Sequence, residues 1–186
     1  MVLGIFLILI VAIALMAVSL YNRLVRLRNH RENAFADIDV QLKQRLDLIP
    51  QLVEAVKAYM KHESSVLTEI TKARAAAMQA TGINEKIAAD ASLTSALQGL
   101  RVAVEAYPDL KASQNFIQLQ EEISDIENKL AAARRFFNSA TRELNNAVET
   151  FPSNIVAGMF GFRRETMYDL GTDQRARAEE TPKLNF

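Results

Sequence analysis

The chain has 186 residues and no cysteine, and its 22 Lys and Arg residues balance its 22 Asp and Glu residues. The lack of cysteine excludes disulfides, a cysteine nucleophile and thiolate metal sites, and the zero net charge gives no bulk electrostatic reason to bind nucleic acid. With only 6 Gly and 4 Pro residues, the composition favours few and long helices.

The N-terminal segment is predicted to cross a membrane. Residues 2–20 contain no charged side chain, and as an α-helix rising about 1.5 Å per residue they would extend roughly 28 Å. That length is close to the hydrocarbon thickness of a bilayer, about 30 Å. Tyr21 follows at interfacial depth, where tyrosine is enriched. Four arginines then form a basic flank suited to lipid headgroups: Arg23, Arg26, Arg28 and Arg31. We predict a single-pass anchor over residues 1–21.

The alternative for the same segment is a cleaved signal peptide, with Ala17-Val18-Ser19 as a small-residue cleavage site. A signal peptide has a basic N-terminal region and a shorter apolar core, and here no basic side chain precedes the core. The anchor is therefore favoured. Because the arginines lie on the C-terminal flank, the positive-inside rule places the following domain in the cytoplasm.

The first long helix of that domain is predicted from Phe35 to about Ala80, ending at Thr81-Gly82. Its apolar residues recur mostly in steps of three and four and form one stripe: Phe35, Ile38, Leu42, Leu46, Ile49, Val53, Val56, Met60, Val66, Leu67 and Ile70. A proline inside a helix removes a hydrogen bond and clashes with the preceding turn. We therefore expect a kink, or a break and restart, between Arg45 and Pro50, with Asp47 as the N-cap of the second piece.

Two further long helices are predicted. One covers about residues 84–106, with Leu93, Leu97, Leu100 and Val104 facing inward, and ends at Tyr107-Pro108-Asp109. The other follows Ser113, a suitable N-cap, and ends at Pro152. Its apolar residues form a heptad seam of nearly five repeats: Phe116, Leu119, Ile123, Ile126, Leu130, Ala133, Phe137, Ala140, Leu144, Ala147 and Phe151.

The predicted fold is all-α. A short helix over about residues 153–159 follows the seam, and Phe160 and Phe162 are expected to pack back on the domain. Long helices with short links bury their stripes most simply against one another, so residues 22–165 are predicted to form an antiparallel bundle of three to four long helices. Residues 166–186 are polar and mixed in charge, which is typical of a loose tail.

Glu63 is the residue that departs most clearly from the apolar pattern. It follows Met60 and precedes Leu67 in the stripe, and a buried carboxylate needs a partner or a proton. Arg134 and Arg135 are candidate partners. The favoured interpretation is a structural ion pair or a rim position that reaches water, and the alternative is a proton-linked switch or a contact site.

No pattern in the chain predicts an enzyme. His30 and His62 are the only histidines, so a histidine metal site with paired spacing is not expected. No phosphate-binding loop, dinucleotide fingerprint or serine-hydrolase motif occurs. We expect no cofactor, no metal and no small-molecule substrate. A phosphotransfer bundle using His62, in its His62-Glu63 pair, is kept as a remote alternative.

Several blocks of the chain together resemble the LemA family. The stretch Tyr21-Asn22-Arg23-Leu24-Val25 with Asn29, and then residues 38–45 with Asp47-Leu48-Ile49-Pro50, are similar to the start of its members. Residues 105–112 with Asn115-Phe116 resemble a second family block. Glu127, residues 133–138 and residues 151–157 resemble a third. Phe136 and Phe137 stand where members often have tyrosine.

This resemblance implies a bacterial plasma-membrane protein with a helical bundle and no known enzymatic activity. Because relatives occur in magnetosome membranes, it implies a scaffold that self-associates and organises membrane or membrane-protein assemblies. Because members are often encoded beside membrane proteases, it implies as the alternative an adaptor for such a partner. The expected partners are thus the lipid bilayer and a second copy or another membrane protein. Asn22, Asp39 and Gln41, which packing does not explain, are candidate interaction residues.

Overall fold

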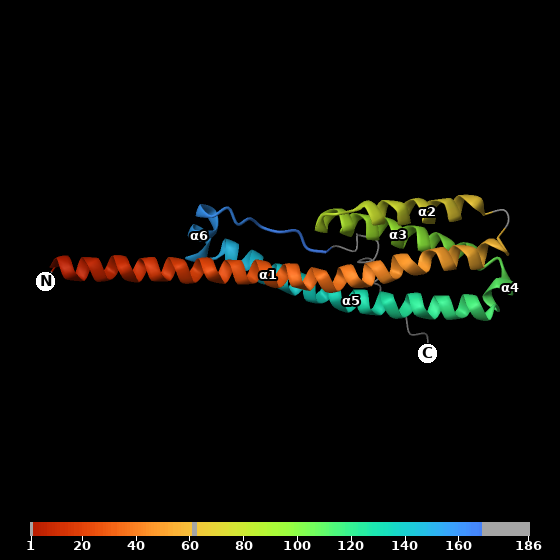
Figure 1. Ribbon diagram of the computed structural model, residues 1–186, viewed down its shortest axis with the longest axis horizontal. Helices are drawn as coiled ribbons and strands as arrows, with labels where there is room; N and C mark the ends of the chain where they lie inside the picture. Colours follow the sequence, from red (N-terminus) through yellow and green to blue (C-terminus); the bar gives the residue numbers. More distant parts are fainter. Residues whose placement is uncertain (1, 61–62, 169–186) are drawn as a thin grey trace, which may run out of the picture. The chain divides into compact units, whose positions relative to one another are not determined.

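The computed structural model describes residues 2–60 and 63–168, and within them it contains α-helices and no β-strand (Figure 1). The all-α prediction is confirmed. The predicted tail falls outside the described residues from position 169 onward. The six helices are α1 (Val2–Lys57), α2 (Ser64–Gln79), α3 (Ile83–Val104), α4 (Pro108–Lys111), α5 (Gln114–Glu149) and α6 (Ser153–Met159).

The chain divides into two compact units, and α1 and α5 each contribute to both. Unit 1 contains residues 2–38 and 132–167, and unit 2 contains residues 39–131 together with Tyr168. Unit 1 thus holds the first part of α1, the last part of α5, and α6. Unit 2 holds the remainder of α1 and α5 with α2, α3 and α4.

Unit 2 is built around a core to which every one of its helices contributes. Its buried residues include Val56 of α1, Ile70 of α2, Leu100 of α3, Leu110 of α4 and Phe116 of α5. Figure 1 shows α2 and α3 lying side by side in this unit, joined by a short turn. The stripes of the helices are therefore buried against one another, as their spacing predicts.

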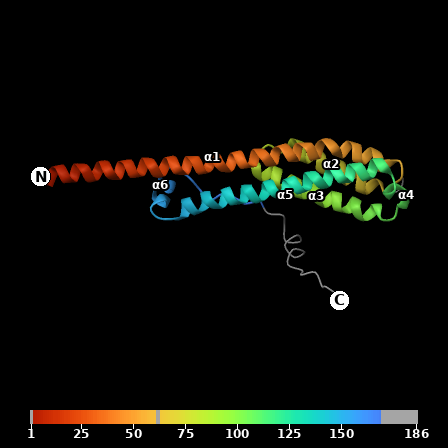
Figure 2. The same cartoon turned by 90° about the horizontal axis from the view of Figure 1, so that it is seen from below.

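Unit 1 has a smaller core, formed where α6 packs against α1 and α5. Leu24, Ala147, Val156 and Ala157 are buried there, with Leu20 and Phe162 among the half-buried residues around them. Figure 2 shows α6 beside α1 in a second direction of view. The expectation that Phe162 packs back on the domain is confirmed.

The N-terminal part of α1 is apolar on every side and exposed. Among the described residues, one helix, α1, is long and apolar enough to cross a membrane, judged by length and composition. Its most apolar stretch, the apolar window, has no buried residue. Leu3, Leu7 and Leu15 are 82%, 64% and 66% exposed. A helix that belonged to a soluble core would bury these side chains.

Of the predicted kink, or break and restart, between Arg45 and Pro50, the break with Asp47 as N-cap is wrong, because α1 continues through Asp47 and Pro50. Pro50 has no N–H, so the carbonyl oxygen of Leu46, four residues earlier, loses its helical partner. The side chain of Arg74 on α2 supplies one, since its Nε donates to Leu46 O at 2.9 Å. The neighbouring helix therefore compensates for the proline, which no pattern within α1 reveals.

The single helix predicted from Phe35 to Ala80 is also wrong. It is divided into α1, which ends at Lys57, and α2, which begins at Ser64. Met60 lies between them and is only 2% exposed, in the same core as Val56 and Ile70. The apolar spacing thus continues past the end of α1, because Met60 is buried although it lies outside both helices.

The two later helices agree closely with prediction. Leu93, Leu100 and Val104 of α3 are buried, and Pro108 begins the short helix α4, a position that favours proline. The heptad seam of α5 is confirmed from Phe116 to Ala147, since most of its members are buried and Leu119, Ile123 and Ala133 are half-buried. Its last predicted member, Phe151, is 78% exposed, because α5 has ended at Glu149.

Candidate functional site

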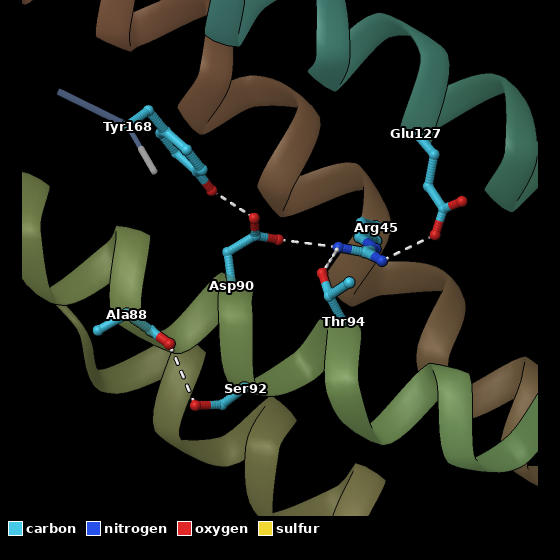
Figure 3. A network of polar contacts seen from close by, with 7 residues as sticks. All are labelled: Arg45, Ala88, Asp90, Ser92, Thr94, Glu127 and Tyr168. Atoms are coloured by element: carbon cyan, nitrogen blue, oxygen red, sulfur yellow. Dashed lines mark hydrogen bonds and ion pairs between the residues drawn. The ribbon is translucent and has the colours of Figure 1, made fainter. Parts of the chain in front are cut away.

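A buried network of polar side chains lies inside unit 2, centred on Arg45 of α1 (Figure 3). Its Nη1 donates to Asp90 Oδ1 at 2.8 Å and to Thr94 Oγ1 at 3.0 Å, both on α3. Its Nη2 donates to Glu127 Oε1 on α5 at 2.8 Å. The Arg45 side chain is 1% exposed and that of Asp90 is 2% exposed, whereas that of Glu127 is 51% exposed.

Tyr168 completes the network from the end of the described chain. Its side chain is buried and its hydroxyl donates to Asp90 Oδ2, so Asp90 receives hydrogen bonds on both oxygens. Both terminal nitrogens of Arg45 and both oxygens of Asp90 are thus bound within the network, whereas the Arg45 Nε is buried without a hydrogen-bond partner among the described residues. A carboxylate bound in this way orients and neutralises the arginine, and it offers no exposed base or nucleophile for catalysis.

A groove with a cavity volume of about 260 Å³ lies beside this network. Small-molecule sites usually enclose roughly 300–1,000 Å³, so the groove does not favour a substrate-sized ligand. Asp39, which the sequence marked as an interaction residue, forms an ion pair with Lys86 at the groove. The lining residues are Asp39, Leu42, Lys43, Leu46, Asp47, Ala77, Met78, Ala80, Lys86, Asp90 and Leu93.

The other candidate interaction residues lie apart from this groove. Asn22 is exposed on α1 in unit 1. Gln41 is half-buried on α1, one helical turn before Arg45. Asp47, which was predicted as a helix cap and not as an interaction residue, is exposed and lines the groove. No site therefore gathers the residues that the sequence analysis could not explain.

A second buried arginine, Arg31, lies in unit 1. Its Nε donates to Thr141 Oγ1 at 3.2 Å, its Nη2 donates to the carbonyl oxygen of Thr166 at 3.3 Å, and Nη2 lies 3.3 Å from Glu165 Oε2. Its guanidinium also lies over the Phe137 ring, 4.9 Å from the centroid. Burial lowers the pKa of Arg31, and the charges of Glu165 and Glu32 oppose that shift.

These contacts correct the sequence prediction for Arg31. It is 5% exposed, so it holds unit 1 together and is not free to bind headgroups. The rest of the predicted basic flank keeps the expected surface position, because Arg23, Arg26 and Arg28 are exposed. Tyr21 packs its ring against Phe160 and Phe162, with centroids 4.7 Å and 6.0 Å away.

The pairing of Glu63 with Arg134 or Arg135 stays a prediction, because Glu63 and these arginines belong to different units. Glu63 is half-buried at the N-cap of α2 in unit 2, where its side chain makes no capping hydrogen bond. Arg134 and Arg135 belong to unit 1, where Arg134 is half-buried and Arg135 is exposed. His62, the basis of the phosphotransfer alternative, lies outside the described residues.

Sequence reasoning missed Arg45, Asp90, Thr94 and Tyr168 as members of a site. A signal was present for the first two. Arg45 lies between Leu42 and Ile49 in steps of three and four, and Asp90 lies three residues before Leu93. Opposite charges at inward positions of two helices predict a buried pair. Tyr168 follows the last helix and carries no periodic signal.

The residues described contain no group of three or more His, Cys, Asp or Glu side chains that could hold a metal ion. The Arg45 network links three helices of unit 2. Unit 1 exposes an apolar window at the start of α1 and the basic side chains Arg23, Arg26 and Arg28 after it.

Comparison with known sequences shows which protein family the chain matches. The model of the LemA family matches residues 34–186. The chain is 30% identical over 140 residues to "Protein LemA" of Metamycoplasma hominis, covering 73% of this chain and 63% of that protein.

Two further relatives are named for the magnetosome. "Magnetosome protein MamQ" of Magnetospirillum gryphiswaldense is 21% identical over 170 residues, covering 77% of this chain and 62% of that protein. "Magnetosome protein MamQ 2" of Paramagnetospirillum magneticum is 20% identical over 188 residues, covering 87% of this chain and 67% of that protein. The chain thus spans about two thirds or less of the length of the first two relatives that it matches.

Proposed function

The chain belongs to the LemA family, and from that premise we propose that it is a non-enzymatic interaction protein anchored in the bacterial plasma membrane. The observation that carries the proposal is the apolar window at the start of α1, of which none is buried. An all-round apolar helix that is not covered by protein is stable only in lipid. The carboxylates of the Arg45 and Arg31 clusters are each bound to an arginine, which supports a non-enzymatic role.

The proposed orientation places the helical domain in the cytoplasm. Its support is the exposed basic flank, Arg23, Arg26 and Arg28, on the C-terminal side of the window. Because the chain has no cysteine, Val102→Cys, at a position 75% exposed, gives one accessible thiol. In cells with an intact plasma membrane but a permeable outer layer, a membrane-impermeant maleimide should label it only after the plasma membrane is opened. Labelling before opening would contradict the orientation.

Within this role, we propose that the protein is a scaffold that self-associates. Support comes from its similarity to magnetosome proteins, whose names refer to a structure and not to a reaction. The test is the mass and composition of the particle extracted from native membranes in mild detergent. A particle of several copies of this chain alone is expected, and a monomer at micromolar concentration would contradict self-association.

An adaptor for another membrane protein, such as a protease, is the second candidate. The groove of unit 2 favours it, because apolar side chains such as Leu46 and Met78 line it together with charged Lys43 and Asp47. That mixture suits the side chains of a protein partner. In the same extraction, a second protein in fixed proportion would support the adaptor, and clean isolation of this chain would count against it.

A further inference from the structure

Helix α6 in unit 1 has one buried face and one exposed apolar face. Ser153, Val156 and Ala157 are buried. Ile155 and Met159, four residues apart and so neighbours on the helix surface, are 56% and 76% exposed.

Two aromatic residues extend this exposed face at the ends of α6. Phe151 before the helix is 78% exposed, and Phe160 after it is 59% exposed. Single exposed apolar side chains are ordinary, whereas four large ones lie within ten residues here, and clustered exposed apolar side chains often mark an interaction site. We call Phe151, Ile155, Met159 and Phe160 the α6 patch.

The α6 patch lies beside the point on α1 where the apolar window ends. The ring of Phe160 packs against that of Tyr21, with centroids 4.7 Å apart. Val156 and Ala157 share a core with Leu24, and Ala17 and Leu20 pack against that core. From Ala17 to Leu24 an α-helix rises only about 10 Å. Figures 1 and 2 both show α6 alongside this part of α1.

Position and charge together indicate the occupant of the patch. If residues 2–20 span the hydrocarbon, α6 lies at the depth of the headgroups, where amphipathic helices bury apolar side chains about 5–10 Å deep. The same unit carries five exposed arginines, namely Arg23, Arg26 and Arg28 on α1 and Arg163 and Arg164 after α6. The guanidinium of Arg28 lies over the ring of Phe162, 5.5 Å from its centroid. Arg164 is also paired with Glu149 at 2.9 Å. A basic surface beside an apolar patch suits anionic phospholipid.

We propose that α6 is a second membrane contact, which lies in the interface of the bilayer and inserts the α6 patch among the headgroups and upper acyl chains. The proposal rests on the proposed membrane anchor. A single spanning helix leaves unit 1 free to rotate about the helix axis. The α6 contact would prevent that rotation and so fix the orientation of unit 1 on the membrane.

The test uses single cysteines in the full chain, which has none of its own. Ile155→Cys and Met159→Cys carry an environment-sensitive NBD fluorophore in vesicles of phosphatidylcholine and phosphatidylglycerol. Leu7→Cys in the apolar window reports on the anchor. Met78→Cys is the matched control, because Met78 is also methionine and 62% exposed but belongs to unit 2. Quenching is measured with nitroxide lipids labelled near the headgroup or near the chain end.

The proposal predicts that the labels at positions 155 and 159 are quenched, more strongly by the shallow nitroxide than by the deep one. The label at position 7 is quenched by the deep nitroxide, and the label at position 78 is not quenched. If position 7 is quenched but positions 155 and 159 behave like position 78, the α6 contact is overturned and the anchor stands. If position 7 is not quenched, the anchor fails and the α6 contact fails with it.

A second copy of the chain is the competing occupant of the patch. It would shield the labels at positions 155 and 159 from water without quenching by lipid, and oxidation of unlabelled Met159→Cys would join two chains. That result overturns the lipid proposal. The contribution of charge is tested by the double variant Arg163→Gln with Arg164→Gln. It should reduce the increase in quenching that vesicles containing phosphatidylglycerol give over vesicles of phosphatidylcholine alone. Unchanged quenching would exclude these two arginines from lipid binding.

Discussion

Arg31 and Arg45 occupy the same position of one heptad stripe on α1, with Leu24, Ile38 and Leu52 at the equivalent positions of the other repeats. Both arginines are buried, yet the two units neutralise them differently. In unit 2, Arg45 binds a buried carboxylate on α3 and a half-exposed one on α5. In unit 1, Arg31 binds a hydroxyl, a backbone carbonyl, an aromatic face and a carboxylate that is 41% exposed.

This difference shows what each arginine holds in place. The Arg45 network joins three helices, so its hydrogen bonds form in one packing arrangement of α1, α3 and α5. The Arg31 cluster joins α1 and α5 to the non-helical segment at residues 165 and 166. That segment is held a second time by Asn145, which exchanges two hydrogen bonds with the backbone of Glu165, at 2.9 Å and 2.8 Å. A buried counter-charge should make the first site more sensitive to mutation than the second.

The largest effect is expected for Arg45→Met, which leaves Asp90 buried without the Arg45 charge. Breaking one side of a buried ion pair costs about 3–5 kcal/mol of unfolding free energy. Chemical unfolding followed by circular dichroism in detergent measures the loss. Lys43→Met is the control, because Lys43 is an exposed cation on the same helix. An equal loss for both variants would contradict a structural role for the network.

Adding Asp90→Leu to Arg45→Met sharpens this result. Replacing both partners of a buried pair with apolar side chains is often neutral or stabilising. The double variant should therefore recover most of the loss caused by Arg45→Met, and a further loss would show that Asp90 stabilises the unit independently of Arg45.

Arg31→Met should cost less, about 1–3 kcal/mol, because it removes charged hydrogen bonds but leaves no fully buried carboxylate. Glu165 can reach water, and the methionine side chain keeps the apolar contact with Phe137. The same unfolding measurement applies, with the exposed Arg26→Met as control. A loss equal to or larger than that of Arg45→Met would reverse the comparison between the two units.

A third arginine in the helical domain, Arg74, binds a backbone carbonyl and is predicted to act only through Pro50. Arg74→Met should cost about 1–2 kcal/mol, because Leu46 O is left without a partner. In a Pro50→Ala background it should cost little, since residue 50 then donates its own N–H to Leu46. The double-mutant cycle measures this coupling, and additive losses would contradict our explanation of the unbroken helix.

The smallest effect concerns the start of α3. The Glu85 carboxylate accepts hydrogen bonds from the N–H groups of Thr81 and Gly82, and these bonds lower its pKa below the ordinary value of 4.5. A carboxyl group with a lowered folded pKa contributes stability above its unfolded pKa and loses that contribution as pH falls through the folded pKa. Glu85→Gln should therefore be slightly destabilised at neutral pH and equal to the native chain in strong acid.

Much of the fold could be predicted from the sequence because helical periodicity is a local signal. The seam of α5 and the inward residues of α3 follow directly from their spacing. The behaviour of α1 at Pro50 could not be predicted in this way, because the compensating group is on another helix. The turn after Lys57 was missed because Met60, inside it, is as buried as a helical core residue.

The site was less predictable than the fold. Tracing the stripe of α1 through Leu46 instead of Arg45 hid a charged residue at a position that is 1% exposed. Arg31 was assigned to the headgroups because of its place in a run of arginines, whereas its partners lie more than a hundred residues away along the chain. Tyr168 approaches Asp90 from beyond the last helix, which only a three-dimensional arrangement can reveal.

The most direct test of the anchor is the intact mass of the chain that remains in membranes after an alkaline carbonate wash. The account predicts that the chain resists extraction and keeps residues 2–20, with a mass near the 20.8 kDa of the full sequence. A chain that is released by carbonate, or one that lacks the segment up to Ser19, would show that the apolar helix is no anchor and would contradict the proposed function.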